Sequence, residues 1–142
     1  MHELDKIALR KALRQQRAQL TREQVTAAGA AVARQILACD AFRKAKSIMG
    51  FLAFGKELSV DLVLEQALAM GKIVAVPHIE SATSFVPVRL KNLQDFDLDR
   101  YGIRTVRPPL ELIEPNAFDL VLVPGVAFAS YILVYMTGIL IG

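Results

Sequence analysis

Cysteine and histidine are almost absent from this sequence of 142 residues, and each absence removes a class of site. Cys39 is the single cysteine, so an internal disulfide framework and a cysteine-cluster zinc site are excluded. His2 and His78 are the two histidines, and so small a number argues against a histidine-based metal centre. Glycine (8) and proline (6) are also few, so the composition is neither disordered nor collagen-like.

We also expect no N-terminal secretory signal, because the first five residues are mostly polar and no apolar run follows them. We therefore expect a cytoplasmic location. The length suits one compact domain, since two full domains would be cramped in a chain of this size.

Positive charge is concentrated in the first third of the chain. Residues 1–46 contain ten Lys or Arg against four Asp or Glu, whereas residues 47–142 contain seven against ten. A basic segment on a near-neutral body indicates contact with an anion, such as a nucleotide phosphate, a polyglutamate-like substrate, nucleic acid or a membrane surface. A solvated helical face explains the same pattern, so both interpretations stay open.

Two helices are predicted in this basic third. Residues 3–20 have helical periodicity, and Thr21-Arg-Glu-Gln24 has the form of a capping box that begins a second helix ending near Cys39. We expect both helices to pack on the rest of the domain through apolar stripes. The stripes contain Leu4, Ile7, Leu9, Leu13 and Leu20 in the first helix, and Val25, Ala28, Val32 and Ile36 in the second.

Short uncharged runs after residue 46 predict buried strands near 47–53, 73–77 and 119–124. Between the first two, a helix over about 60–70 begins at Ser59 or Asp61 and ends at Gly71. Strand, helix and strand with short connections predict two parallel strands. A further strand over 85–90 is expected at a sheet edge, because Pro87 has no N–H to donate to a central ladder.

Several segments, in this order, resemble one known family. They are Lys6-Ile-Ala-Leu-Arg10, Phe51-Leu-Ala-Phe-Gly-Lys-Glu57, Gly71-Lys-Ile-Val-Ala-Val-Pro77 and Asp119-Leu-Val-Leu-Val-Pro-Gly-Val-Ala-Phe128. Over residues 4–128 the sequence resembles the 5-formyltetrahydrofolate cyclo-ligase family, also called methenyltetrahydrofolate synthetases. With the periodicity, this predicts an α/β fold: a three-layer, Rossmann-like domain with a mainly parallel sheet and two N-terminal helices.

The resemblance implies a ligase of folate metabolism. In that family ATP, accompanied by Mg²⁺, phosphorylates the formyl oxygen of 5-formyltetrahydrofolate, and the folate N10 then attacks the activated carbon to give 5,10-methenyltetrahydrofolate. Lys6 and Arg10 match the phosphate-contacting pair, and Leu52 and Glu57 match folate-contacting residues. Ordinary roles remain open for each: a solvated basic face for Lys6 and Arg10, a loop acid for Glu57 and plain core for Leu52. We expect no binding of nucleic acid or membrane, and a monomer if the chain is intact.

The sequence departs from the family after Phe128. Ala129 stands where the family has Asp, the glycine-rich segment that follows in the family is not seen, and residues 120–142 carry no charge. We therefore expect a partial domain over 1–128, incomplete at its C-terminus, an aberrant apolar tail over 129–142, and impaired activity in this chain. Three alternatives stay open: a tail-anchored membrane protein with a small cytosolic α/β domain, an inactive folate- or nucleotide-binding relative, and a nucleic-acid-binding module that uses the basic helix.

Overall fold

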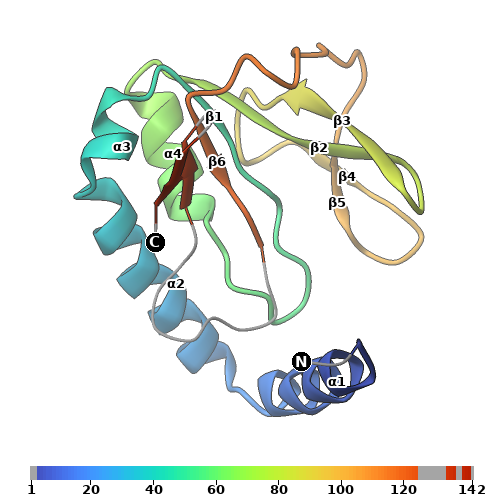
Figure 1. Cartoon of the computed structure of the whole chain (residues 1–142). Coiled ribbons are helices and arrows are strands. Elements are labelled where there is room, and N and C mark those ends of the chain that lie inside the picture. Colours follow the sequence, from blue (N-terminus) through green and yellow to red (C-terminus); the bar gives the residue numbers. More distant parts are fainter. Residues whose placement is uncertain (1–2, 125–133, 137–138, 142) are drawn as a thin grey trace.

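Helices and strands alternate along the computed structural model of the chain, which describes residues 3–124, 134–136 and 139–141 (Figure 1). The helices in these residues are α1 (Glu3–Ala18), α2 (Arg22–Leu37), α3 (Asp40–Lys44) and α4 (Asp61–Ala69). The strands are β1 (Ser47–Met49), β2 (Ile73–Ser81), β3 (Ser84–Arg89), β4 (Phe96–Leu98), β5 (Arg104–Val106), β6 (Leu120–Leu122), β7 (Val134–Met136) and β8 (Ile139–Ile141).

The main sheet has the order β3-β2-β1-β6-β7-β8. Its centre is parallel, because β1 pairs in parallel with β2 on one side and with β6 on the other. The outer pairs, β2 with β3, β6 with β7 and β7 with β8, are antiparallel. The predicted α/β fold with a mainly parallel central sheet is therefore confirmed.

The β1 strand is shorter than the predicted run of 47–53. The N–H of Gly50 still donates to the carbonyl of Ala75 over 2.9 Å, which extends the ladder with β2 by one residue. Beyond Gly50 the chain leaves the sheet and enters an irregular segment that ends where α4 begins. The apolar residues at the start of this segment, Phe51 and Leu52, are therefore not part of a strand. They pack against the core from outside the ladder.

The β2 strand, in contrast, is longer than predicted and forms a hairpin with β3. Pro77 lies opposite Pro87 in this antiparallel pair. The β3 strand forms the edge of the sheet, as the proline predicted. A separate two-stranded sheet is formed by β4 and β5, and Phe96 and Val106 of these strands pack against the core.

The capping box at the start of α2 is present as predicted. The N–H of Gln24 donates to Thr21 Oγ1 over 3.1 Å, and the N–H of Thr21 donates to Gln24 Oε1 over 2.9 Å. These two bonds satisfy backbone donors that the first helical turn leaves without a partner. The sequence therefore fixes the start of α2 locally, without help from the rest of the fold.

The buried face of α2 is partly different from the predicted stripe. Its buried residues are Val25, Gly29, Ala33 and Ile36. Ala28 is exposed, so that part of the stripe was predicted wrongly. The physical reason is close approach: a Cβ on Gly29 would lie 3.3 Å from the carbonyl oxygen of Ser59, so the smallest residues face the neighbouring segment.

The α1 helix does not pack as predicted. None of its residues is buried, and the side chain of Leu4 is 78% exposed. Figure 1 shows α1 apart from the main sheet, whereas α2, α3 and α4 gather along one side of it. An apolar stripe shows that a helix can be buried, but it does not identify a partner, and in this stripe only Leu13 is even half-buried.

The core lies between α2, α4 and the central strands. Its largest fully buried side chains are Phe42, Ile48, Leu64, Leu90, Leu120, Val63, Val74, Val76 and Val88. The α4 helix contributes through Val63, Leu64 and Ala67, and Gly71 follows it with a φ of +76°, as expected of a helix-terminating glycine. This core fixes α2 and α4 relative to β1, and so fixes the two walls of the site described below.

The tail-anchored membrane protein, one of the alternatives from the sequence, requires a membrane-spanning segment near the C-terminus. Among residues 3–124, 134–136 and 139–141, no helix has the length and apolar character needed to cross a bilayer. Within 120–142, the described residues include the strands β6, β7 and β8 and no helix. The remainder of the predicted tail, residues 129–133, 137–138 and 142, lies outside the described residues.

Candidate ligand-binding site

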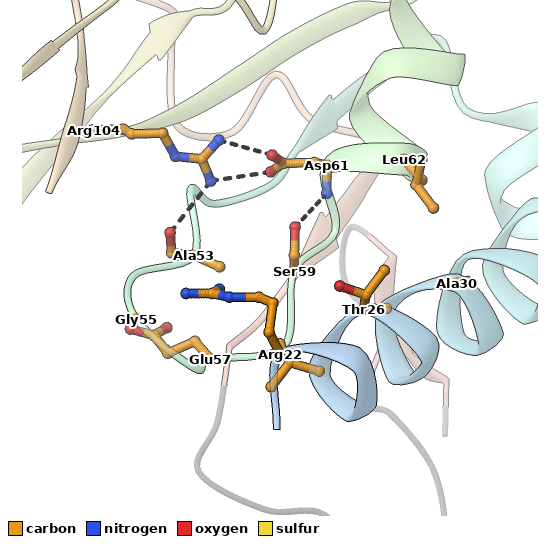
Figure 2. Close-up of a pocket in the computed structure, with 12 residues that line it drawn as sticks. Arg22, Thr26, Ala30, Ala53, Gly55, Glu57, Ser59, Asp61, Leu62 and Arg104 are labelled. Atoms are coloured by element: carbon orange, nitrogen blue, oxygen red, sulfur yellow. Dashed lines mark hydrogen bonds and ion pairs between the residues drawn. The ribbon is translucent and has the colours of Figure 1, made fainter. Parts of the chain in front are cut away.

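A pocket of about 410 Å³ lies between α2 and the segment that joins β1 to α4. One wall comes from the first half of α2, and the other from residues 53–62. Arg104, at the start of β5, closes one side (Figure 2). Because the joining segment follows a parallel strand at its carboxyl end, the pocket occupies the position at which open α/β sheets commonly bind ligands.

Glu57 lines this pocket from a tight turn. The N–H of Glu57 donates to the carbonyl of Phe54 over 3.1 Å, which closes the turn. Gly55 has a φ of +61° within it, a backbone conformation that glycine adopts without steric cost. The side chain of Glu57 is half-buried, so the turn presents a carboxylate that is partly shielded from water.

Arg104 and Asp61 form a bidentate ion pair at the side of the pocket. Arg104 Nη1 donates to Asp61 Oδ2 over 2.7 Å, and Nη2 donates to Asp61 Oδ1 over 3.2 Å. Nη2 also donates to the carbonyl of Ala53 over 3.3 Å, and the guanidinium lies 5.3 Å from the ring centre of Phe96. Two parallel bonds to one carboxylate give this pair a fixed geometry, which single-point surface pairs lack.

The pocket therefore has two neutralised charges and two free ones. Among the described residues, neither the carboxylate of Glu57 nor the guanidinium of Arg22 has a hydrogen-bond or ion-pair partner. Figure 2 shows the side chain of Arg22 reaching from the start of α2 across the pocket toward the turn that carries Gly55 and Glu57. Such a site can accept hydrogen bonds from a ligand at Glu57 and bind an anionic or carbonyl oxygen at Arg22.

Lys6 and Arg10, the predicted phosphate ligands, lie outside this pocket. Both are exposed on α1, one helical turn apart, and Arg10 Nη1 lies 3.9 Å from Glu3 Oε1. A contact connects α1 with the pocket turn, because Lys56 Nζ donates to the carbonyl of Ala18 over 2.5 Å. The helix that carries the predicted phosphate ligands is thus attached, at its C-terminus, to the turn that carries Glu57.

Leu52 is placed differently from Glu57, although the two are close in sequence. It is half-buried and packs against the hydrophobic core, and it is not among the residues that line the pocket. Of the four predicted site residues, the structure thus places Glu57 in the pocket and the other three elsewhere.

Sequence reasoning missed Arg22 and Arg104, and it assigned Asp61 only a capping role. The N-cap position of α4 is Val60, and the Oγ of Ser59, one residue before it, accepts a hydrogen bond from the N–H of Asp61 over 3.1 Å. The carboxylate of Asp61 instead binds a residue 43 positions further along the chain. No local pattern predicts a contact over that separation. For Arg22, its place directly after the capping Thr21 was a usable signal, because it puts a cation beside the helix start.

Comparison with known proteins identifies the kind of protein that this fold and site belong to. The fold is α/β, with a candidate ligand pocket after a central parallel strand. Residues 2–131 match the sequence profile of the 5-formyltetrahydrofolate cyclo-ligase family. Because this match covers most of the chain, the chain belongs to that family.

The matching relatives are longer than this chain. A probable 5-formyltetrahydrofolate cyclo-ligase of Caenorhabditis elegans is 29% identical over 119 residues, which cover 79% of this chain and 58% of the relative. The chain thus spans under two thirds of the length of that protein.

Two solved structures share the fold. The NMR structure of the 5,10-methenyltetrahydrofolate synthetase of Aquifex aeolicus superimposes with a TM-score of 0.71 at 23% identity, over 86% of this chain and 61% of that one. The 5,10-methenyltetrahydrofolate synthetase of Mycoplasma pneumoniae gives a TM-score of 0.63 at 20% identity, over 84% of this chain and 63% of that one. At these identities the likeness establishes the fold.

Proposed function

We propose that this protein binds 5-formyltetrahydrofolate and ATP and converts the folate to 5,10-methenyltetrahydrofolate. Membership of the family over residues 2–131 is the observation that carries the proposal. The free carboxylate of Glu57, in a pocket that follows a central parallel strand, supports it independently.

Glu57 is the residue that we assign to recognition of the folate. A pterin ring presents adjacent N–H groups, and one carboxylate accepts hydrogen bonds from two of them at once. Glu57 suits this role because the Arg104–Asp61 pair leaves its oxygens free. Leu52 is assigned to the same ring as an apolar neighbour, a role that requires the segment to bring it from the core to the ligand.

Lys6 and Arg10 are assigned to the phosphates of ATP. They lie on successive turns of α1, so both can reach one polyphosphate. Arg10 can bind a phosphate through two parallel hydrogen bonds, and Lys6 adds a point charge. Their exposure leaves both side chains accessible to a nucleotide.

Magnesium would accompany the nucleotide in this reaction. Within the described part of the chain, no group of three or more His, Cys, Asp or Glu side chains is arranged to hold a metal ion. We therefore assign no residue to the metal. When bound, the ion supplies charge neutralisation for the transferred phosphoryl group.

In this reaction the assigned residues position the substrates and supply fixed charge. Transfer of a phosphoryl group to the formyl oxygen builds negative charge, and cations already in place stabilise it without reorganisation. In this scheme Lys6 and Arg10 supply those cations, and Glu57 fixes the pterin ring so that the formyl oxygen faces the nucleotide. None of the four acts as a covalent nucleophile.

Isothermal titration of the purified chain with 5-formyltetrahydrofolate and with ATP tests the proposal. Formation of 5,10-methenyltetrahydrofolate is followed in parallel by its near-ultraviolet absorbance, with ATP and Mg²⁺ present. Binding of both ligands together with product formation is the expected result. Binding without product would identify a folate- or nucleotide-binding relative, and absence of both would contradict the proposal.

A further inference from the structure

The segment that carries Glu57 is attached at both ends to one side chain, that of Arg104. Its guanidinium binds the carbonyl of Ala53, before the turn, and the carboxylate of Asp61, after it. Arg104 belongs to β5, so the β4–β5 hairpin contacts the pocket wall at two points (Figure 2). Glu57 lies between these two points.

This attachment matters because the segment has little regular structure of its own. Residues 50–60 form no helix or strand. Within them, the turn at Glu57 is closed by a single backbone hydrogen bond to Phe54. A segment of this kind depends on side-chain contacts with its surroundings for its position.

The ion pair is also partly shielded from solvent. The side chains of Arg104 and Asp61 are 25% and 35% exposed, whereas those of Arg107 and Asp97, which pair within the same hairpin, are 56% and 54% exposed. Partial burial and bidentate geometry both strengthen a pair relative to an exposed one. Arg107 pairs with Asp95 and Asp97 near its own hairpin, whereas the pair made by Arg104 reaches the pocket.

Charge gives Arg104 a second effect on the same site. Asp61 and Glu57 both line the pocket, and without Arg104 the carboxylate of Asp61 would be a second unpaired acceptor there. It would compete for the hydrogen-bond donors of a ligand and repel the carboxylate of Glu57. Arg104 occupies both oxygens of Asp61 and so leaves Glu57 as the free carboxylate of the pocket.

We propose that Arg104 is a positioning residue for the folate pocket, acting through Asp61 and the carbonyl of Ala53 to hold Glu57 in its binding position. The inference rests on the proposed function for the identity of the ligand. The positioning of the segment itself is independent of any ligand and is tested separately.

The test compares Arg104→Met and Asp61→Asn with the control Arg107→Met in the full chain. Methionine keeps an unbranched apolar side chain of similar length but removes the guanidinium, and with it the hydrogen bonds and the contact with the ring of Phe96. Arg107 is a matched control because it pairs with Asp97 in the same hairpin and does not line the pocket. Each arginine variant removes one positive charge, so a general effect of charge would appear in both.

The first readout is amide hydrogen exchange without ligand. We expect exchange within residues 54–60 to become faster in Arg104→Met and Asp61→Asn, by about tenfold or more if at least one strong hydrogen bond is lost. Exchange in β2 and β3 should stay unchanged, and Arg107→Met should leave residues 54–60 as they are in the parent. Equal exchange in 54–60 for Arg104→Met and the parent would overturn the proposal.

The second readout is the Kd for 5-formyltetrahydrofolate and for ATP, by titration calorimetry. We expect Arg104→Met to raise the folate Kd by about tenfold or more and to change the ATP Kd by less than about twofold. The double variant Arg104→Met/Asp61→Asn should bind folate no more weakly than the weaker-binding of the two single variants, since each single substitution already removes the same ion pair. A lower melting temperature with an unchanged folate Kd would reduce Arg104 to a structural role and overturn the proposal.

Failure of the proposed function gives a different result. If the parent chain binds no folate while exchange in 54–60 still responds to Arg104→Met, Arg104 positions the segment and the ligand assignment is wrong. If the parent binds folate while neither exchange nor Kd responds, the ligand assignment holds and the positioning role is wrong.

Discussion

The backbone N–H of Asp119 lies 3.1 Å from the Oγ of Ser47, to which it donates, and 3.1 Å from the carbonyl of the same residue. Ser47 Oγ donates in turn to the carbonyl of Ala117 over 2.7 Å. The side chain of Asp119 adds a further bond between the two segments, since its Oδ2 accepts a hydrogen bond from the N–H of Lys46 over 2.8 Å. These bonds join the starts of β1 and β6, so one buried serine sets the register of the two central strands.

Ser47→Ala should therefore destabilise the protein by about 1–3 kcal/mol, because the carbonyl of Ala117 loses its donor beside the core. Urea unfolding followed by circular dichroism measures the change. Ser84→Ala is the control, since the Ser84 hydroxyl pairs with Ser81 at the exposed tip of the β2–β3 hairpin. It should change the stability by less than about 0.5 kcal/mol. Equal effects of the two substitutions would contradict this account of Ser47.

Gly50→Ala should destabilise the protein through the core rather than through the backbone. A Cβ at Gly50 would lie 2.5 Å from Leu64 Cδ2, and Leu64 is fully buried. Such overpacking costs about 1–3 kcal/mol. Gly71→Ala is an informative comparison, because its Cβ would meet nothing within 4 Å and the cost there arises from a φ of +76°.

Thermal unfolding of Gly50→Ala, Leu64→Ala and the double variant tests this contact. We expect the double variant to be less destabilised than the sum of the two single variants, because the shorter side chain makes room for the added methyl group. Strict additivity would mean that the two residues do not clash.

Glu57→Gln should weaken folate binding and leave ATP binding nearly unchanged. The amide keeps the shape of the side chain but replaces one acceptor oxygen by a donor, which opposes a pair of N–H groups. The loss of a charged hydrogen bond corresponds to about 1.5–3 kcal/mol. Titration with each ligand measures the two affinities separately. Glu65→Gln on the exposed face of α4 is the control, and it should alter neither.

Arg10→Ala should show the opposite selectivity. We expect weaker ATP binding, by about 1.5–3 kcal/mol for one lost charged hydrogen bond, with the folate affinity retained. Lys11→Ala removes the same charge from the adjacent exposed position of α1 and serves as the control. If Lys11→Ala weakens ATP binding as much as Arg10→Ala, the helix attracts nucleotides by its general charge, and Arg10 makes no specific contact.

Much of the fold was predictable because its signals are local. The capping box at Thr21, the terminating glycine at 71 and the edge strand marked by Pro87 each depend on a few neighbouring residues. The face of α2 was harder, because alanine and glycine fill much of that helix and hydrophobic periodicity does not distinguish Ala28 from Gly29. Contact with Ser59 decides between them, and that contact is tertiary.

The site residues also separate into those that a local motif predicts and those that only tertiary contacts reveal. Glu57 was found through a motif of consecutive residues, and the structure places it in a pocket. Arg104 was missed because its partners, Asp61 and Ala53, are 43 and 51 positions away. The exposure of α1 was missed for a related reason: an apolar stripe does not state which surface covers it.

The arrangement of the central strands also means that β1 is synthesised well before its neighbour β6. Ser47 and Asp119 are 72 residues apart, and β6 follows Asp119 directly. At the usual 5–20 residues per second, a ribosome needs about 4–14 seconds to make that stretch. Once Arg89 has been added, the nascent chain holds β1, β2 and β3, while one edge of β1 has no strand to pair with until β6 is made. The side of β1 that lies in the middle of the finished sheet is thus an exposed strand edge during translation. A chaperone that covers unpaired strand edges would bind there.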